Sequence, residues 1–449
     1  MKKKLLFIIP TLSCGGAERA VVALLNKMDF TKYDIDLMLF RRDDMHYINS
    51  VPKEVNLLEN DLLTDLCFCH VKHLLKFKYL LNYFQIVMTR IYTTIRLKWN
   101  SLTNAKKVFY DWDKINKYIP NLNKKYDVAV SFLEGLSNFY VTEKVNACIK
   151  IGWIRADYEL WGYDKNHDIP YFKKLNYLFS VSNANAEKMK NIFPQIADKI
   201  YTMYNIIDFD LIAKKSKMKI AESEFNDNKD ITILSIGNLR PVKGYDKSIE
   251  ACKILKEKGY NFKWFVLGEG NDRARLEKMI NANELKKCFF LLGLKDNPYP
   301  YLAAANIYVQ SSKHEGFSTT IREAKFFELP IVITDCPGMS DQISDGINGL
   351  IAEQNSQDLA NKIEKLIINQ ELRASFSEAL KNSSDSDNGK ELNKLNEIIY
   401  AFLTIFLYLL KCPQSLILSA LRAFCFCGKP HISRSIFLYF RYQTWLKSW

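Results

Sequence analysis

The alternation of apolar and polar positions predicts two successive series of buried strands and amphipathic helices. In the first series, Ala20, Val21, Leu24 and Leu25 recur at the three- and four-residue spacing of one helix face. The strands expected in this series are 5–10, 35–40, 127–132, 150–154, 178–181 and 199–204. Apolar runs of this kind are typical of parallel strands that are covered on both faces.

A second series of the same kind begins at residue 231. Its expected strands are 231–236, 262–267, 289–292, 307–310 and 331–334. Its expected helices are 245–257, 272–282, 299–304, 319–327 and 356–368. Strands that alternate with helices indicate an α/β chain with parallel sheets.

The fold class that we expect is therefore α/β, with two doubly wound Rossmann-like domains facing a cleft, plus a basic apolar C-terminal extension. The expected boundaries are an N-terminal domain at 1–205, a polar Lys-rich linker at 206–229, a C-terminal domain at 230–381, and a flexible join with a tail at 382–449. The apolar piece at 5–10 is too short for a signal peptide and is expected to be the first buried strand. Ligands of such folds bind at the carboxyl ends of the strands.

The positive charge of the chain is concentrated in two segments. The 449 residues carry a formal net charge of +13. Residues 66–110 contain eight Lys or Arg and no Asp or Glu, and residues 398–449 contain six and again no acid. These two segments together therefore account for the whole net charge.

Both segments also contain many aromatic and aliphatic residues, which is typical of contact with an anionic membrane. For 66–110, the alternative is a pair of buried helices with solvated lysines. Nucleic acid is disfavoured as a partner because the aliphatic content is too high for a face that touches only phosphate. Residues 398–410 are thirteen positions without a charge, fewer than the roughly 20 of a spanning helix. We expect this part of the tail to lie at, or dip into, the membrane.

The ten cysteines give no sign of a metal site or a disulfide framework. None forms a CxxC pair, and no His cluster completes a zinc set. We expect reduced thiols that mostly fill core positions.

The most informative stretch for chemistry is 313–324, which contains two glutamates eight positions apart. Glu315 is expected in the loop after a strand, and Glu323 in the first turns of the next helix. The helix N-terminus between them offers free N–H groups that suit a phosphate, and Gly316 allows close approach of the backbone. Carboxylates accept hydrogen bonds from sugar or ribose hydroxyls. An acidic pair on solvated surface is the alternative.

A second loop, at 237–244, follows the first strand of the second series and adds positive charge. Arg240 and Lys243 lie three positions apart in an expected turn and could converge on a diphosphate. Two solvated surface cations are the alternative. The Gly268-Glu269-Gly270 turn ends the next strand, where a base or ribose often lies.

Taken together, these motifs resemble a known family. The ordered set GGAER, SFLEG, VSNAN, YNIID, GNLRPVKG, LGEG, HEGFSTTIREA and PIVITDCPG, spread over roughly residues 4–380, is similar to the retaining nucleotide-sugar glycosyltransferases of family four. The resemblance implies the two-domain GT-B fold. It is closest in style to enzymes of bacterial capsule, lipopolysaccharide and other lipid-linked glycan synthesis.

The resemblance also implies roles for individual residues. Arg240 and Lys243 would hold the donor diphosphate and stabilise the leaving nucleotide, and Glu315 would bind the donor sugar near the reacting carbon; these three form the expected catalytic set. Glu323 would bind the ribose hydroxyls. The other expected donor-binding residues are Gly15, Gly16, Leu294, Gly316, Phe317, Ser318, Thr319 and Thr320.

The resemblance implies no metal or other cofactor, because fixed cations and a helix N-terminus can neutralise the leaving diphosphate. The one DxD motif, Asp385-Ser386-Asp387, lies in a polar join and is interpreted as a solvated loop.

One feature departs from the family pattern. Many members carry a His near the donor sugar in the N-terminal domain, but the matching strand ends here read SFLEG and WIRADYE. The acceptor-side candidates are therefore Glu18, Glu134, Arg155 and Asp157. The alternative is that the last three only hold the interdomain cleft together. His167 is interpreted as a surface residue.

The expected function is transfer of a hexose or N-acetylhexosamine, with retention, from a nucleoside-diphosphate sugar to a lipid-linked glycan acceptor at the cytoplasmic membrane face. Uridine is the expected base. The partners would be the donor, a polyprenyl-linked or other glycan acceptor and an anionic membrane surface, with no nucleic acid. The alternatives are a membrane-bound nucleotide-binding scaffold or inactive relative, and a two-Rossmann sugar-nucleotide epimerase. No GxGxxG follows the first strand, which disfavours a nicotinamide dehydrogenase.

Overall fold

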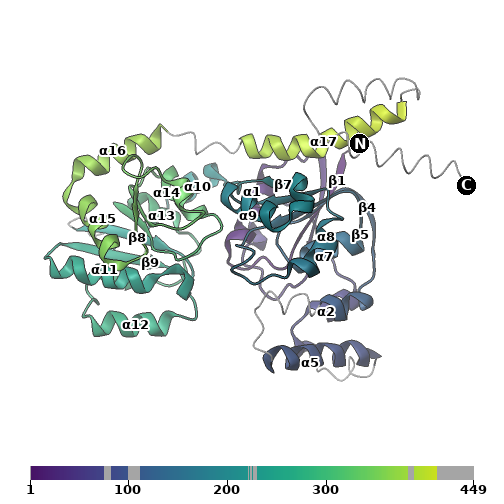
Figure 1. The fold of residues 1–449 in the computed structure, drawn as a ribbon, viewed down its shortest axis with the longest axis horizontal. Helices are drawn as coiled ribbons and strands as arrows, with labels where there is room; N and C mark the ends of the chain where they lie inside the picture. Colours follow the sequence, from purple (N-terminus) through teal and green to yellow (C-terminus); the bar gives the residue numbers. More distant parts are fainter. Residues whose placement is uncertain are drawn as a thin grey trace, which may run out of the picture.

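The computed structural model describes residues 2–74, 82–99, 112–220, 222, 225, 230–382 and 389–411. Within these residues, two parallel sheets with flanking helices form two domains that lie next to each other (Figure 1). This arrangement confirms the expected fold class of two doubly wound Rossmann-like domains.

The sheet of the N-terminal domain has seven strands in the described residues, in the order β3-β2-β1-β4-β5-β6-β7. Every pairing is parallel, and Lys3 to Ile9 of β1 lie opposite Tyr33 to Leu39 of β2. The strands are β1 (Lys3–Ile9), β2 (Tyr33–Leu39), β3 (Asn56–Leu58), β4 (Leu122–Ser131), β5 (Val145–Ile154), β6 (Tyr177–Ser180) and β7 (Ile200–Thr202). The apolar run from Leu5 to Ile9 is buried at the centre of the sheet, so its assignment as the first buried strand is confirmed.

Helix α1 (Gly16–Lys27) lies where the apolar periodicity predicts and buries Ala20, Val21, Leu24 and Leu25. The domain also contains the helices α7 (Leu136–Lys144), α8 (Lys165–Phe172) and α9 (Asn183–Ile192). Short 3₁₀ turns lie at Ile48–Ser50, Asn116–Tyr118 and Pro194–Lys199. Strand β3 was not expected, since three residues give too short a pattern to stand out.

The C-terminal domain has a six-stranded parallel sheet in the described residues, in the order β10-β9-β8-β11-β12-β13. The strands are β8 (Ile231–Ile236), β9 (Phe262–Leu267), β10 (Phe289–Leu291), β11 (Ile307–Gln310), β12 (Ile331–Thr334) and β13 (Leu350–Ala352). The helices are α11 (Tyr245–Glu257), α12 (Arg273–Ala282), α13 (Tyr299–Ala304), α14 (Thr319–Phe326), α15 (Ser356–Ile368) and α16 (Gln370–Lys381), and 3₁₀ turns lie at Pro241–Lys243 and Ser340–Gln342. The strands and helices expected here match closely, because full burial makes their apolar runs unambiguous.

Part of the expected linker belongs to the C-terminal domain instead. Helix α10 (Phe209–Lys215) lies within 206–229. Its Phe209 and Ile212 are buried in the core of the C-terminal domain, and the ring of Phe209 stacks on Phe326 at 4.9 Å. The many lysines of this region suggested a polar linker, but two apolar side chains three positions apart fix a short helix.

The segment after the C-terminal domain returns to the N-terminal domain, which the sequence pattern did not indicate. Helix α17 (Gly389–Lys411) runs along the N-terminal domain (Figure 1). Its Leu395 and Ile399 are buried in that domain's core, and Asn396 Oδ1 accepts a hydrogen bond of 2.8 Å from the Tyr33 hydroxyl. The first part of the expected tail therefore covers protein, while residues 412–449 lie outside the described part of the chain.

The basic segment 66–110 forms helices as expected in its described part. Helices α2 (Leu62–Phe68), α3 (Val71–Leu74) and α5 (Phe84–Trp99) lie at one end of the N-terminal domain (Figure 1). The inward side chains of these helices, including Leu66, Ile86 and Val87, are buried, which agrees in part with the alternative of buried helices. Among the described residues, no helix combines the length and apolar character needed to cross a membrane.

Candidate functional site

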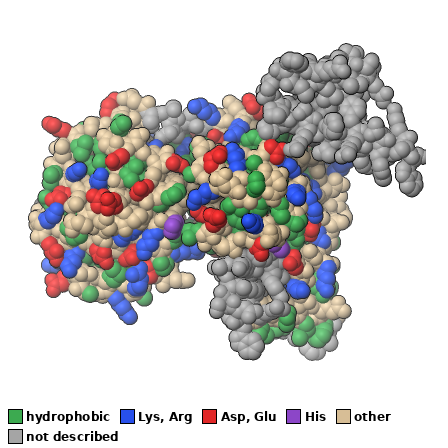
Figure 2. Space-filling view, in the orientation of Figure 1, with side chains coloured by type: hydrophobic (Ala, Val, Ile, Leu, Met, Phe, Trp, Pro, Cys, Tyr) green, Lys and Arg blue, Asp and Glu red, His purple; other side chains and the backbone are tan. Residues whose placement is uncertain are grey.

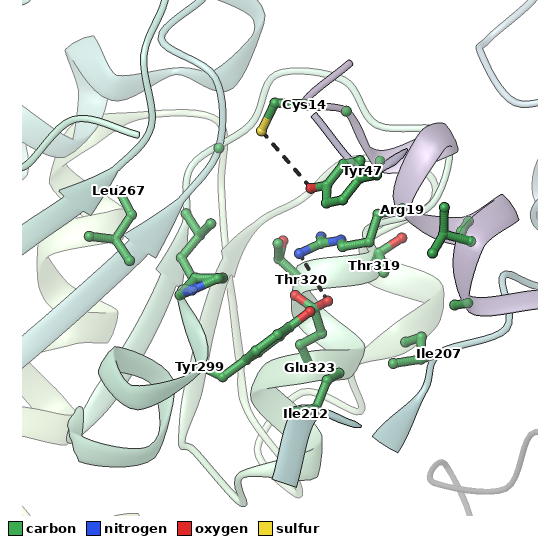
Figure 3. Close-up of a pocket in the computed structure, with 18 of the residues that line it drawn as sticks. Cys14, Arg19, Tyr47, Ile207, Ile212, Leu267, Tyr299, Thr319, Thr320 and Glu323 are labelled. Atoms are coloured by element: carbon green, nitrogen blue, oxygen red, sulfur yellow. Dashed lines mark hydrogen bonds and ion pairs between the residues drawn. The ribbon is translucent and has the colours of Figure 1, made fainter. Parts of the chain in front are cut away.

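A cavity of about 270 Å³ lies between the two domains and is lined by both. The N-terminal domain contributes the glycine loop before α1 together with Arg19 and Tyr47. The C-terminal domain contributes the loops after β8, β9 and β11 and the start of α14 (Figure 3). Strand β1 lies between β2 and β4, and β8 between β9 and β11. The order in which successive strands are added therefore reverses at β1 and at β8, beside the cavity. Such switch points are where ligands of doubly wound folds bind.

The loop Cys14–Gly16 forms one wall of the cavity. Gly15 caps helix α1 without a side-chain hydrogen bond, and a Cβ atom at Gly15 would lie 2.2 Å from Glu18 Oε2. Ser13 Oγ donates to Glu18 Oε1 at 3.2 Å, and burial raises the pKa of the Glu18 carboxyl. Gly15 and Gly16 line the cavity as expected, whereas Glu18 folds back beneath the loop and does not line it.

Glu315 is the centre of a hydrogen-bonded network on the opposite wall. Its Oε1 accepts from Gln310 Nε2 at 2.8 Å and from Ser312 Oγ at 2.9 Å, and it is paired with Lys243 Nζ. Strands β8 and β11 are hydrogen-bonded neighbours, so the loops that follow them carry Lys243 and Glu315 to the same edge. Both residues belong to the expected catalytic set, and the structure places their side chains in direct contact.

Gln310 connects Glu315 to the start of helix α14, and the sequence analysis missed it. Its Oε1 accepts from Ser318 Oγ at 2.8 Å and from Thr320 Oγ1 at 3.1 Å, while its Nε2 donates to Glu315. An amide side chain can accept from hydroxyls with its oxygen and donate to a carboxylate with its nitrogen. A polar residue that ends an otherwise apolar strand, Ile307-Tyr308-Val309-Gln310, was the signal available in the sequence.

The N-terminus of helix α14 lines the cavity beside this network. Ser318 is the N-cap, and its Oγ accepts from Ile321 N at 3.3 Å, while Thr319 Oγ1 accepts from Asn205 Nδ2 of the N-terminal domain at 3.1 Å. Phe317 packs against Tyr204 with ring centroids 5.1 Å apart. Ser318, Thr319, Thr320 and Phe317 all line the cavity, as expected of donor-binding residues.

Gly316 does not line the cavity but sets the distance between the domains. A Cβ atom at this position would lie 2.3 Å from the carbonyl oxygen of Arg155, in the N-terminal domain. The loop after β11 can therefore approach that domain only because it lacks a side chain here.

Glu323 makes an ion pair across the cleft with Arg19, which the sequence analysis did not single out. Arg19 Nη1 lies 3.1 Å from Glu323 Oε1, and the Glu323 side chain is 1% exposed. Burial raises the pKa of Glu323, and the positive charge of Arg19 opposes that rise. The second oxygen, Oε2, is buried without a hydrogen-bond partner in the described residues, and the Tyr299 ring lies beside the carboxylate (Figure 3).

Two of the expected donor-side residues lie further out. Leu294 lines the cavity and is 44% exposed at its rim. Arg240 is exposed and is not among the lining residues. Its backbone is extended (φ −130°, ψ 150°) just before the 3₁₀ turn that holds Lys243. The expected pairing of Arg240 with Lys243 around one anion stays a prediction.

The acceptor-side candidates of the N-terminal domain are not among the residues that line the cavity. Glu134 Oε2 accepts from Arg155 N at 2.8 Å, and Arg155 Nη1 donates to Asn205 Oδ1 at 2.5 Å. Burial lowers the pKa of Arg155 and raises that of Glu134. Asp157 Oδ2 pairs with Lys188 at 2.8 Å. All of these partners belong to the N-terminal domain, so the interpretation that the three residues hold the cleft together stays a prediction.

His167 is not a surface residue, contrary to expectation. Its ring nitrogens lie 3.0 Å from Asp168 Oδ1 and 3.2 Å from Asp113 Oδ1, and its side chain is 16% exposed. No group of three or more His, Cys, Asp or Glu in the described residues is placed to hold a metal ion. The DxD motif at 385–387 lies outside the described residues, so the expected absence of a metal stays a prediction.

The comparison with protein families identifies the C-terminal domain. Residues 216–383 match the family of glycosyl transferases group 1. This stretch holds Lys243, Glu315, Glu323 and the loops around them, so the C-terminal side of the cavity lies in the part of the chain that is similar to this family. The finer assignment to family four stays a prediction.

Curated relatives are glycosyltransferases of glycan synthesis. The poly(ribitol-phosphate) alpha-N-acetylglucosaminyltransferase of Staphylococcus aureus is 30% identical over 231 residues, which cover 50% of this chain and 44% of the relative. The N,N'-diacetylbacillosaminyl-diphospho-undecaprenol alpha-1,3-N-acetylgalactosaminyltransferase of Campylobacter jejuni is 28% identical over 259 residues, covering 56% and 64%. The similarity thus spans less than two thirds of the length of either relative.

Solved structures with the same fold cover nearly the whole chain. Anabaena HepE in complex with UDP and glucose superposes with a TM-score of 0.63 at 14% identity, over 89% of this chain and 100% of that one. S. aureus TarM, solved with fondaparinux, alpha-GlcNAc-glycerol and UDP, superposes with a TM-score of 0.61 at 18% identity, over 88% and 99%. The chain therefore has the GT-B fold.

Proposed function

We propose that this protein is a glycosyltransferase that moves a hexose or N-acetylhexosamine from a nucleoside-diphosphate sugar to a lipid-linked or other glycan acceptor. The observation that carries the proposal is the wall of the interdomain cavity, where Lys243, Glu315 and the N-terminus of α14 face the Gly15–Gly16 loop. The group 1 domain and the names of the relatives support the reaction class.

The donor's diphosphate would lie against Lys243 and the first turn of α14. Free backbone N–H groups and the positive end of the helix dipole favour an anion there. Lys243 would then pair with the diphosphate in place of Glu315. The carboxylate of Glu315 would become free to bind hydroxyls of the donor sugar. Charge that develops on the leaving diphosphate meets fixed positive groups, and this is how such a site lowers the barrier.

In our proposal, the uridine base and the acceptor lie at opposite ends of the interdomain cavity. Leu294 at the rim would contact the base, and Glu323 is the candidate for the ribose hydroxyls because its Oε2 is buried without a partner in the described residues. The Gly15–Gly16 loop would face the donor sugar and the acceptor. A UDP donor is supported by the UDP-bound structures that share the fold. We further propose retention of configuration, independence of metal ions, and a place in surface polysaccharide synthesis at the inner face of the cell membrane.

A panel of nucleotides tests the donor site. Thermal unfolding of the purified chain is measured with UDP, GDP, ADP and TDP, with and without EDTA. UDP is expected to raise the melting temperature most, and EDTA to leave the shift unchanged. At a hundred times the dissociation constant, the stabilisation is about 2.7 kcal/mol.

The matched variants for this panel are Lys243→Met and Lys258→Met. The first removes the cavity-lining lysine that pairs with Glu315. The second removes an exposed lysine just after helix α11 that pairs with Glu364. The UDP shift should shrink strongly in the first variant and persist in the second. No response to any of the four nucleotides would reject the proposed donor pocket.

A further inference from the structure

Helix α5 (Phe84–Trp99) forms the outer layer of the small helical extension at one end of the N-terminal domain (Figure 1). One face of the helix is buried, because Ile86 and Val87 pack with Leu66 and Leu74 of the neighbouring helices. Arg90 Nη2 donates to the carbonyl oxygen of Cys69 at 3.1 Å and ties α5 to the end of α2. The helix is therefore anchored on one side, and its opposite side defines a surface of the domain.

The opposite face of α5 carries large apolar side chains in contact with solvent. Phe84, Met88, Tyr92 and Ile95 are 59%, 43%, 52% and 56% exposed. Their spacing of four, four and three residues places them within an arc of about 80° on a helix of 3.6 residues per turn. These four residues are the α5 stripe, and Figure 2 shows hydrophobic side chains gathered over this end of the molecule.

Such a stripe is unusual on this protein. Of the twelve exposed large hydrophobic side chains in the described part of the chain, four belong to the α5 stripe, and the others are spread over several different elements. Single exposed apolar residues are ordinary, but a contiguous apolar patch marks an interaction surface.

The charge of the surrounding segment selects the partner. Residues 66–110 contain eight Lys or Arg and no Asp or Glu. A helix with an apolar face inside a wholly cationic segment matches an anionic lipid bilayer, in which head groups attract the cations and the acyl boundary accepts the apolar side chains. A nucleic acid would satisfy the cations but not the apolar stripe.

We propose that the α5 stripe docks this protein on an anionic membrane, with α5 lying in the plane of the interface. At 1.5 Å per residue, its sixteen residues span roughly 24 Å, less than the ~30 Å of a hydrocarbon core. The inference rests on the proposed function, since it places the N-terminal domain and the cavity next to a membrane that holds a lipid-linked acceptor. Helix α17 lies at the other side of the N-terminal domain (Figure 1), so α5 and α17 are on different sides of that domain.

Flotation of the full chain with vesicles tests the surface. The vesicles contain one part phosphatidylglycerol to two parts phosphatidylcholine, and pure phosphatidylcholine vesicles serve as the neutral comparison. The test variant combines Phe84→Gln, Met88→Gln, Tyr92→Gln and Ile95→Gln, because Gln keeps good helix propensity at exposed positions. The control variant combines Ile347→Gln and Ile368→Gln, whose side chains are 65% and 64% exposed on the C-terminal domain.

The wild-type chain and the control variant are expected to bind the anionic vesicles equally, and the α5 variant at least tenfold less. Equal binding by the α5 variant, or no binding by the wild-type chain, would overturn the proposal. The response to UDP is measured on the same samples, and no α5 residue lines the cavity. A chain that docks through α5 but ignores UDP would refute the proposed function and leave the docking surface standing.

Methionine oxidation provides a second test on the unaltered chain. Met88 lies in the stripe, and Met218, which follows α10, is 61% exposed and serves as an internal control. Anionic vesicles are expected to slow peroxide oxidation of Met88 several-fold and to leave Met218 unchanged, as followed by mass spectrometry of peptides. Unchanged oxidation of Met88 on vesicles that bind the protein would show that another surface docks.

Discussion

Replacing Glu315 by Gln is expected to lower the rate of sugar transfer about a thousandfold while UDP still binds. The substitution keeps the shape of the side chain, and an amide oxygen can still accept from Gln310 Nε2 and Ser312 Oγ, the donors now at 2.8 and 2.9 Å. The substitution removes the negative charge that lies next to Lys243 and, in the proposed complex, next to the reacting sugar. Loss of one preorganised electrostatic group in an active site typically costs a factor of 10² to 10³ in rate.

The comparison variant is Glu371→Gln, which changes an exposed carboxylate at the start of α16 and should transfer sugar at the wild-type rate. Release of UDP from a UDP-sugar measures transfer, and calorimetric titration with UDP measures binding. Wild-type turnover in Glu315→Gln would refute the role given to this carboxylate. Loss of UDP binding together with turnover would show that the change disturbs the pocket and does not act on the reaction itself.

Replacing Arg19 by Met is expected to lower the free energy of unfolding by about 3–5 kcal/mol near neutral pH. Glu323 is 1% exposed, and Arg19 at 3.1 Å is its charged partner. Its other oxygen is already buried without a hydrogen-bond partner in the described residues. Removing one member of a buried ion pair leaves the other charge uncompensated, and this typically lowers the free energy of unfolding by about 3–5 kcal/mol.

The loss should depend on pH in a defined direction. Burial raises the pKa of Glu323 above its ordinary 4.5, and Arg19 opposes that rise, so the variant shifts the pKa further upward. Between the unfolded and folded pKa values, the folded chain then binds more protons than the unfolded chain. The free energy of unfolding therefore falls as pH rises through that window, and the deficit of the variant should be smallest near pH 4.5 and largest above the raised pKa.

Urea unfolding at pH 5 and pH 8 measures this difference. Lys27→Met is the matched control, because Lys27 lies on the same helix and pairs with Asp208 at 3.1 Å and with the exposed Asp210 at 2.7 Å. The Lys27 side chain is 29% exposed and that of Asp210 is 92% exposed, and ion pairs that solvent reaches contribute only about 0–1 kcal/mol. Equal and pH-independent losses in the two variants would mean that the Arg19–Glu323 pair has no special weight.

Much of the fold could be predicted because a fully buried strand requires a continuous run of apolar residues, which is easily seen in the sequence. The strands of the C-terminal domain are continuous apolar runs, and the ends of β8, β9, β11 and β12 lie where that pattern stops. Lys243 and Glu315 could be placed together for the same reason, since parallel neighbours deliver their following loops to one edge of a sheet.

Contacts between distant segments could not be predicted. The Arg19–Glu323 pair depends on the relative position of the two domains, and the local periodicity of the sequence contains no information about that position. Helix α17 shows a related limit, because an apolar helix face has the same pattern whether it covers lipid or protein. Its Leu395 and Ile399 pack on the N-terminal domain, while the basic segment 66–110 has both a buried face and an exposed stripe on α5.

The most direct test of the central claim is transfer itself. Purified protein is incubated with labelled UDP-sugars and a membrane lipid extract that contains polyprenyl-linked glycans, and label is followed into the lipid fraction, with Glu315→Gln in parallel. The account predicts that one UDP-sugar labels the lipid fraction, that EDTA does not stop the reaction, and that the variant transfers almost nothing. Absence of transfer from every UDP-sugar by a protein that binds UDP would contradict it and would favour a nucleotide-binding scaffold.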